Sequence, residues 1–447
     1  MDQKVFCQIP VFFSEARYLS HETECFWREN KHDMKSTTSG KSAPSAPHGL
    51  TLSFSKTYLK FTPTSTTSPP MITRLIHAIV FTVAVASAED TSLTKRISQR
   101  SFPSVFQAWN DATPTAAADV PTMQALHDLV FLHPSVMGLN SGTTCEGMAF
   151  EFAASDIAKA REKRANLLTK NPQLVLLAEI RYRDAPKGFL PEDAPWWQRD
   201  ADGKFIIGWP EGGYRLLDVA QADWQIQVAK RAKAVMDTGV FDGVMLDWWT
   251  DDESRLNLIR RIRESIGKEA LVLVNSNDQP IPQTAEYVNG LYMECYRTRS
   301  VEDWKRISET LSWAEQKLRA PRINCLETWF HQSRLDLHLM RAVTTLSLTQ
   351  SDGYCLFADP NDLPTPDHLH DWYGFWDKGL GRPLKPGVKR ADGGWEREFA
   401  SGTVIHNPAG GASIQVRFDE PRQSRATGLT STEHRINAND GDIFLHR

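Results

Sequence analysis

Residues Phe241 to Trp249 read Phe-Asp-Gly-Val-Met-Leu-Asp-Trp-Trp. The uncharged positions 243–246 lie between two acidic residues, as in a short buried strand of a parallel sheet. In a parallel α/β barrel, the carboxyl end of such a strand opens onto the active-site face, where Asp247 would lie. The two tryptophans that follow offer flat apolar surfaces for a sugar ring. A carboxylate beside aromatic rings at a strand end suggests glycoside chemistry.

The same kind of short apolar run recurs along the chain, mostly separated by amphipathic helices. The expected strands are 103–110, 128–133, 173–181, 241–247, 270–275, 290–294, 321–327 and 353–357. The expected helices are 156–169, 224–236 with Asp223 as its cap, 254–266, 301–318, 335–349 and 369–376. This alternation predicts a (β/α)8 TIM barrel over residues 102–380. A doubly wound open sheet is the alternative, but the sequence lacks the Gly-rich phosphate loop that such sheets often carry.

Two further segments accompany the regular strand–helix pattern of the expected barrel. The long connection 182–217 contains Trp196, Trp197 and Trp209, so we interpret it as a binding loop over the barrel mouth. From residue 381 the pattern changes to short alternating strands with turn residues between them. Residues 381–447 are therefore expected to form a small β-sandwich-like domain packed on the barrel.

The N-terminal part shows no core pattern. Residues 1–70 include a Ser-, Thr- and Pro-rich run and are expected to be an unstructured extension outside the native protein. Residues 71–88 have a basic start, an apolar stretch and an Ala-x-Ala end, which are the parts of a secretory signal peptide. We therefore expect Met71 to be the true start, residues 89–101 to be a polar leader, and the protein to be secreted or periplasmic.

The composition limits the classes of binding partner and cofactor that we expect. The net charge of −4 gives no basic patch, so we expect no nucleic-acid partner, and no membrane contact after signal cleavage. We expect a monomer, and we expect no cofactor. A metal is not expected either, because the sequence has no Cys-x-x-Cys pair and no His-x-His pair at the first strand. The cysteines from Cys145 onward are interpreted as buried thiols, with one disulfide involving Cys145 as the alternative.

Four carboxylates lie at predicted strand ends: Glu179, Asp247, Glu294 and Glu327. Glycosidic cleavage needs two carboxyl groups, one to donate a proton and one to attack the sugar or activate water. Asp247 and Glu294 are the predicted catalytic pair, because their strands lie two positions apart around the barrel. For each acid, the structural alternative is a carboxylate that caps a helix or pairs with an arginine.

The remaining predicted site residues are expected to bind substrate. They are Glu327, Glu179, Arg181, Trp109, Trp209, Trp248, Asn275 and Trp329. Arg181 could equally be a salt-bridge partner of the acids, and Asn275 could equally stabilise a turn. Neighbouring residues at a strand end point opposite ways, so at most one of the adjacent tryptophans 248 and 249 should face a sugar.

The motif Asp-Gly-Val-Met-Leu-Asp at 242–247, preceded by Leu-Asp-Val at 217–219 and a helix with Trp224, resembles hypothetical bacterial glycosyl hydrolases of the GHL type. It is also similar to polygalactosaminidase-like barrels, in which Asp-Gly-x-x-x-Asp marks the fourth strand. Residues 397–408 resemble the first strands of the small β domain that follows such barrels. The resemblance covers residues 102–447. It implies that Asp247 is the fourth-strand catalytic carboxylate and Glu294 its sixth-strand partner, and it favours a retaining enzyme with Asp247 as nucleophile.

These observations predict a secreted glycoside hydrolase that cleaves O-glycosidic bonds of a poly- or oligosaccharide. The alternative is a non-catalytic carbohydrate-binding TIM barrel, which would bind a glycan without releasing reducing ends. The absence of a Gly-x-Ser-x-Gly elbow argues against a serine hydrolase. The sequence leaves retention or inversion open, since that outcome depends on the distance between the carboxyl groups.

Overall fold

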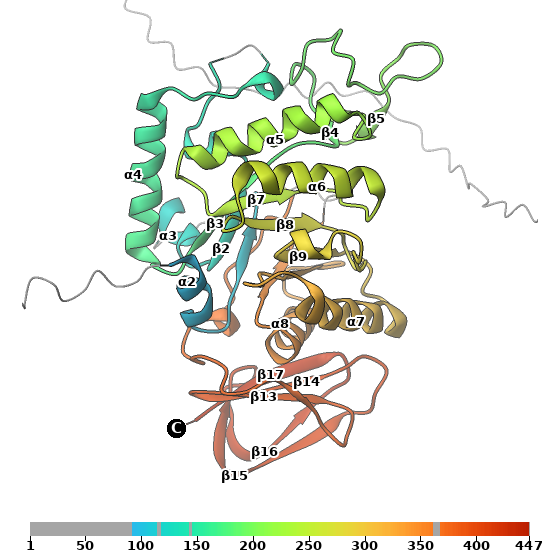
Figure 1. The fold of residues 1–447 in the computed structure, drawn as a ribbon. Coiled ribbons are helices and arrows are strands. Elements are labelled where there is room, and N and C mark those ends of the chain that lie inside the picture. The colour runs from blue at the N-terminus through green and yellow to red at the C-terminus, as the bar shows by residue number, and fades with distance from the viewer. Residues whose placement is uncertain (1–91, 114–117, 143–144, 361–366, 447) are drawn as a thin grey trace, which may run out of the picture. The chain divides into compact units, whose positions relative to one another are not determined.

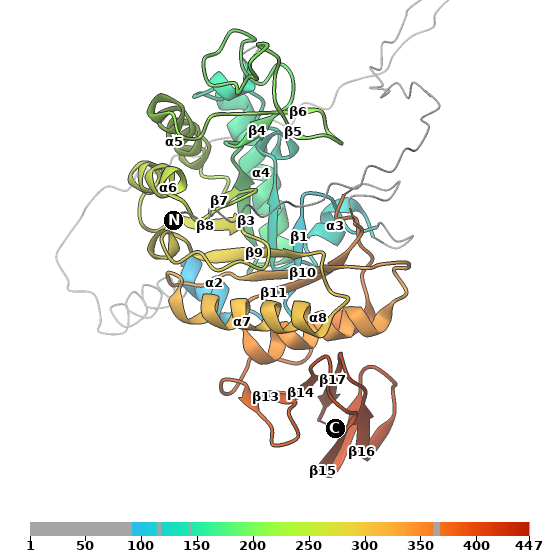
Figure 2. The same cartoon turned by 90° about the vertical axis from the view of Figure 1, so that its right-hand side faces the viewer.

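The computed structural model describes residues 92–113, 118–142, 145–360 and 367–446. Eight parallel strands form the sheet of a TIM barrel, which confirms the predicted fold (Figures 1 and 2). In sheet order they are β1 (Phe106–Ala108), β2 (Leu129–Leu132), β3 (Val175–Glu179), β7 (Gly243–Leu246), β8 (Leu271–Asn275), β9 (Gly290–Cys295), β10 (Cys325–Trp329) and β11 (Tyr354–Ala358). A parallel bridge between Val105 and Cys355 closes the ring. The predicted extension 1–70 and signal segment 71–88 lie outside the described residues.

Five long helices follow the predicted pattern and cover the outside of the sheet (Figure 1). They are α4 (Ala154–Lys170), α5 (Ala222–Asp237), α6 (Glu253–Ile266), α7 (Val301–Lys317) and α8 (Leu337–Gln350). The predicted cap of α5 is wrong: the helix begins after Gln221, so Asp223 lies in its first turn. Within the described ranges, none of the helices combines the length and apolar character that a membrane crossing requires.

The predicted helix 369–376 is also wrong. This segment is extended and ends in the short 3-10 turn η4 (Gly374–Trp376). His370 forms a parallel bridge with Ala112, and Trp376 is fully buried against the barrel. Tertiary contacts of these aromatic side chains therefore fix an extended path where the spacing of apolar residues indicates a helix.

Strand β7 has an acidic residue at each end, as the sequence predicts. Asp242, at the amino end, pairs with Arg164 at 2.7 Å and with Arg96. Arg96 belongs to α2 (Leu93–Gln99), a short helix in the segment expected to be a polar leader. Asp242 thus links the amino end of β7 to α2 and α4, whereas Asp247 lies at the opposite, carboxyl end of the strand.

Gly243 sets how closely β7 and β8 approach. A Cβ on Gly243 would lie 2.2 Å from the carbonyl oxygen of Leu271, which is backbone of the barrel sheet and cannot move alone. Gly243→Ala is expected to lower the free energy of unfolding by about 3 kcal/mol, the upper range for overpacking, as measured by urea denaturation. The control is Gly142→Ala, since an added Cβ there meets nothing within 4 Å. Equal stability of the two variants would contradict this account.

The long connection 182–217 carries a small antiparallel sheet of its own. Its strands are β4 (Asp184–Ala185), β6 (Tyr214–Leu216) and β5 (Ile207–Trp209). Trp197 is buried, and the ring of Trp196 packs 5.3 Å from that of Trp224. Only part of the aromatic content of this connection is therefore left for a binding surface.

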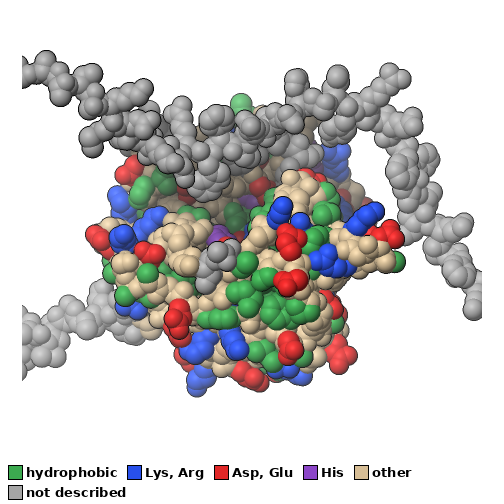
Figure 3. Space-filling view, turned by 90° about the horizontal axis from the view of Figure 1, so that it is seen from above, with side chains coloured by type: hydrophobic (Ala, Val, Ile, Leu, Met, Phe, Trp, Pro, Cys, Tyr) green, Lys and Arg blue, Asp and Glu red, His purple; other side chains and the backbone are tan. Residues whose placement is uncertain are grey.

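The C-terminal strands form one antiparallel sheet. In sheet order they are β12 (Val388–Lys389), β13 (Trp395–Phe399), β14 (Gly402–Asn407), β17 (Asp440–Leu445), β15 (Ile414–Ser424) and β16 (Thr430–Ile436). The sheet packs on α8 of the barrel, where Arg341 and Asp440 form an ion pair at 2.7 Å (Figure 2). On the face seen in Figure 3, acidic and basic side chains are interspersed over the visible part.

Candidate active site

A cavity of about 190 Å³ lies among the strand ends that carry the predicted carboxylates. Most of the predicted site residues line it, namely Trp109, Glu179, Arg181, Trp209, Asp247, Trp248 and Glu294. Five further residues complete the lining: Asn110, Asp184, Tyr214, Asp367 and His368. The predicted residues Asn275, Glu327 and Trp329 do not line the cavity, and each contacts one of its walls instead.

Asn275 joins the two predicted catalytic acids. It ends β8, which lies between β7 and β9 in the sheet. Its Nδ2 donates to Asp247 Oδ1 over 2.8 Å and to Glu294 Oε2 over 2.7 Å, while its Oδ1 accepts from the backbone N–H of Asn277. Because one nitrogen makes both bonds, the two acceptor oxygens lie no further apart than the sum of these lengths, about 5.5 Å. Carboxyl groups lie roughly 5–5.5 Å apart in retaining glycosidases and roughly 6.5–9.5 Å apart in inverting ones.

The surroundings of Asp247 and Glu294 raise the pKa values of the two acids to different extents. Burial, and then the charge of Glu179, raise the pKa of Asp247 to about 6. Burial raises the pKa of Glu294 to about 8; the positive charge of His368 opposes this rise, and the charges of Asp247 and Glu327 add to it. Near pH 7, Asp247 is therefore mostly ionised while Glu294 mostly holds its proton. A pair of acids divided in this way can supply one nucleophile and one proton donor.

Glu179 and Arg181 form the wall next to Asp247. Arg181 Nη2 lies 3.2 Å from Glu179 Oε1, and Arg181 Nη1 lies 3.9 Å from Asp184 Oδ1. The guanidinium also stacks on the ring of Tyr214, 4.5 Å from its centroid. Arg181 is thus both a salt-bridge partner and a cavity residue. These contacts fix the plane of its guanidinium, whose N–H groups can donate to a ligand beside Asp247.

His368 lies next to Glu294, the candidate general acid. The sequence did not indicate it as a site residue. Its Nε2 lies 3.7 Å from Glu294 Oε1 and 3.1 Å from Asp367 Oδ1, and its Nδ1 lies 2.8 Å from Glu327 Oε1. Burial alone would lower the pKa of His368, but Glu327 and Asp367 raise it well above its ordinary value. The imidazole is therefore a buried cation facing three carboxyl groups. The only sequence signal is an Asp-His pair shortly after the eighth strand.

Glu327 lies fully buried behind His368. Besides the histidine, its carboxylate accepts hydrogen bonds from Tyr292 Oη and from Trp329 Nε1. In the register of β9 and β10, Glu327 is directly opposite Glu294. Glu327 thus holds His368 in place rather than facing the cavity.

Three tryptophan rings line the cavity from three different segments of the chain. Trp109 follows β1, Trp209 ends β5 and Trp248 follows β7. Trp248 is 47% exposed, whereas Trp249 is buried and donates from Nε1 to Thr284 Oγ1 over 3.2 Å. As predicted from strand geometry, one member of this tryptophan pair faces the cavity and its neighbour belongs to the core.

Left-handed backbone conformations concentrate at this cavity. Trp109 (φ 48°), Trp248 (φ 52°) and His368 (φ 57°) all line it and all lie in a region that non-glycine residues seldom adopt. Such conformations persist only where the surrounding structure imposes them, and they cluster at functional sites. Across the described part of the chain, no group of three or more histidine, cysteine, aspartate or glutamate side chains is arranged to hold a metal ion.

No family model matches this chain, and no curated protein matches it in sequence. Among solved structures, its fold is similar to that of a noncanonic maltogenic alpha-amylase, AmyB, from Thermotoga neapolitana. The match has 11% identity and a TM-score of 0.50, and it covers 77% of this chain and 99% of the amylase. An alpha-amylase from Malbranchea cinnamomea (11% identity, TM-score 0.48, coverage 79% and 97%) is also found. So is the glycoside hydrolase domain of PelA from Pseudomonas aeruginosa (12% identity, TM-score 0.38, coverage 58% and 96%). The structural neighbours are thus glycoside hydrolases, and at this identity the likeness concerns the TIM-barrel fold.

Proposed function

We propose that this protein is a glycoside hydrolase that cleaves O-glycosidic bonds of an oligo- or polysaccharide with retention of configuration. The observation that carries the proposal is the bridge from Asn275 Nδ2 to both Asp247 and Glu294, which keeps their bonded oxygens within about 5.5 Å. The separated acidities of the two carboxyl groups support the same assignment. Asp247 is the nucleophile and Glu294 is the general acid and base.

In the first step, Asp247 attacks the anomeric carbon and a glycosyl ester forms. The bond to the leaving oxygen breaks, and that oxygen takes the proton from Glu294. In the second step, the Glu294 carboxylate removes a proton from water as the water oxygen attacks the same carbon. The ester bond breaks and Asp247 leaves as a carboxylate, so two inversions give net retention.

The remaining cavity residues fit the binding of a sugar. Trp109, Trp209 and Trp248 provide apolar faces for the C–H surface of a pyranose ring. Arg181 and Asp184 provide hydrogen-bonding groups for hydroxyls beside Asp247.

The stereochemistry of the first product tests the proposal. A panel of oligosaccharides is screened for release of reducing ends, and proton NMR then follows the anomer that forms first on a cleaved substrate. We expect the anomer of the substrate. Accumulation of the opposite anomer would refute retention. Glycan binding without release of reducing ends across the panel would favour the non-catalytic alternative.

The pH dependence of kcat/KM should be bell-shaped. Activity is expected to fall below about pH 6 as Asp247 takes up a proton, and above about pH 8 as Glu294 loses its own. The sign follows from the roles, since the nucleophile must be ionised and the acid must be protonated. Initial rates measured from pH 4 to 10 at low substrate concentration would show both limbs. A profile that is flat across this range would contradict the assignment.

His368 should set the position of the alkaline limb. Its positive charge, next to Glu294 Oε1, favours the ionised form of that acid. His368→Asn removes this charge, so the pKa of Glu294 is expected to rise and the alkaline limb to move to higher pH. The matched control is His338→Asn, whose side chain is 53% exposed and pairs with Asp336. An unchanged or lowered alkaline limb in His368→Asn would show that His368 does not act on Glu294.

A further inference from the structure

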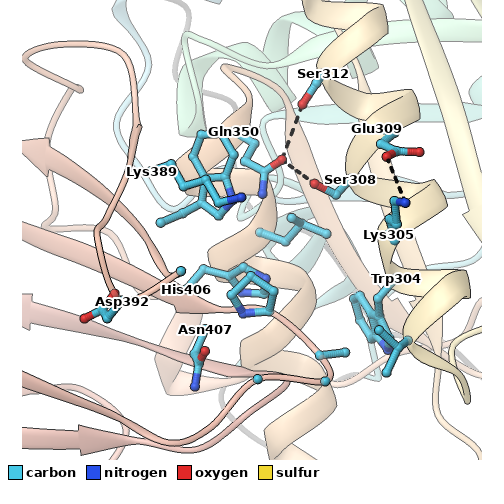
Figure 4. Close-up of a pocket in the computed structure, with 18 of the residues that line it drawn as sticks. Trp304, Lys305, Ser308, Glu309, Ser312, Gln350, Lys389, Asp392, His406 and Asn407 are labelled. Carbon is cyan, nitrogen blue, oxygen red and sulfur yellow. Dashed lines mark hydrogen bonds and ion pairs between the residues drawn. The ribbon is translucent and has the colours of Figure 1, made fainter.

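A second cavity, of about 790 Å³, lies where the barrel helices meet the C-terminal sheet (Figure 4). We call it the α7 groove. One wall is a stripe of α7 that repeats every third or fourth residue and includes Trp304, Ser308 and Ser312. The opposite wall is the sheet, where Trp395 stands in register between Lys389 on β12 and His406 on β14. The groove is thus built jointly by the barrel and the C-terminal sheet.

Two indole rings in the α7 groove keep uncovered surface. Trp313 of α7 and Trp395 of β13 are each only partly buried. Among the residues that the structure describes, neither ring packs against another aromatic ring or an arginine. Most other tryptophans of the fold do have such a partner, as in the packing of Trp196 on Trp224. Trp313 also packs against the hydrophobic core with part of its surface. The uncovered parts of the two indoles offer apolar surface from two different walls of the groove.

Gln350, at the end of α8, contributes an amide that is only half satisfied. Its Oε1 accepts from Ser308 Oγ over 2.6 Å and from Ser312 Oγ over 3.4 Å. Figure 4 shows the amide oxygen turned to the two serines and the nitrogen turned away from them. Its Nε2 is shielded from solvent and has no acceptor within the described ranges. The two serine hydrogen bonds therefore hold the end of α8 against the α7 wall of the groove.

The charges of the α7 groove cancel. Lys305 and Glu309 of α7 form an ion pair at 3.8 Å, and Lys389 and Asp392 add one charge of each sign on the sheet side. Burial lowers the pKa of His406 to about 3, so its ring is neutral. The groove therefore offers no field for a phosphate or a polyanion. Its volume lies within the range of about 300–1,000 Å³ typical of small-ligand sites.

We propose that the α7 groove is a second glycan-binding site, which holds a segment of an uncharged polysaccharide on the indoles of Trp313 and Trp395. The ligand class follows from the two indole rings and the balanced charge of the groove, and does not depend on hydrolysis at the barrel mouth. Binding in the α7 groove would keep a polysaccharide on the protein between successive cleavages in the cavity at the barrel mouth.

Affinity gel electrophoresis of the full-length chain tests this site. The gels contain soluble starch, barley β-glucan, galactomannan or xyloglucan, each an uncharged polymer. We expect at least one polymer to retard the protein. Trp313→Ala and Trp395→Ala should each raise the dissociation constant about tenfold or more for that polymer. The control is Leu384→Ala, which changes a 68% exposed side chain of the same region outside the groove.

Further measurements distinguish a loss of glycan binding from a loss of fold and from turnover of the polymer. Thermal melting of each variant identifies loss of fold, and Trp395→Phe retains an apolar platform if the alanine variant does not fold. The same retardation by the Asp247→Asn protein separates binding from turnover. Equal retardation of groove variants and wild type would overturn the proposal, as would retardation only by polyanions such as polygalacturonate. A dimer in analytical ultracentrifugation that Trp395→Ala dissociates would assign the groove to a second copy instead.

Discussion

Asp247→Asn is expected to lower kcat by roughly 10⁴-fold or more, the scale seen when a catalytic nucleophile is removed. The amide keeps the shape of the side chain but cannot form the glycosyl ester. Reducing-end release on the best substrate of the panel is the measurement. Asp193→Asn, an exposed position, is the matched control and should retain wild-type activity. Full activity of the Asp247 variant would remove this residue from the mechanism.

A smaller side chain at the same position gives a sharper result. Asp247→Ala vacates space on the face from which the carboxylate attacks, so a small external anion can take its place. Added azide is expected to restore part of the lost rate and to give a glycosyl azide of inverted configuration, because only one displacement then occurs. A loss of activity caused by misfolding would show no such rescue. An azide product with retained configuration would contradict the role of Asp247.

Glu294→Gln is expected to lower kcat/KM by about 10³-fold on natural glycosides, within the range for general acid catalysis. The loss should nearly vanish for a 2,4-dinitrophenyl glycoside, whose leaving group departs without a proton. The alkaline limb of the pH profile should also disappear, since it reports the loss of this proton. Glu269→Gln, an exposed position in the loop between α6 and β8, is the control.

Comparison of the two leaving groups decides the role of Glu294. A variant slowed equally on both substrates has lost something other than a proton donor, such as substrate position. In that case the bridge through Asn275 would still place the acid near the reaction, but its function would have to be reassigned.

The barrel could be predicted because its strands are buried on both faces and read as uninterrupted apolar runs, as at 271–274. The error at 369–376 has an identifiable source. Leu369, Trp372, Tyr373 and Trp376 follow helical spacing, yet Trp376 is fixed by burial and by its hydrogen bond to Thr344. Helical periodicity cannot distinguish a helix from an extended segment whose aromatic side chains are placed by tertiary contacts.

The candidate site was only partly accessible from sequence. Strand ends give the positions of Asp247 and Glu294, but not the distance between them. That distance depends on β8 lying between their strands, so that Asn275 reaches both acids. His368 was inaccessible because its partner Glu327 is 41 residues away in the chain and its left-handed conformation is imposed by the fold. Long-range pairing of single side chains leaves no periodic trace in a sequence.

Helix α8 has a consequence for how the protein can be divided. In an ordinary barrel an outer helix shows one face to water, but nearly all residues of α8 from Leu339 to Thr349 are buried. One side covers β10 and β11, and the other is covered by β13, β14 and β17. A barrel truncated after residue 380 would expose this apolar surface and would be prone to aggregate. The C-terminal sheet is therefore an integral part of the folding unit rather than a detachable module, and heat or denaturant should unfold both in one cooperative transition.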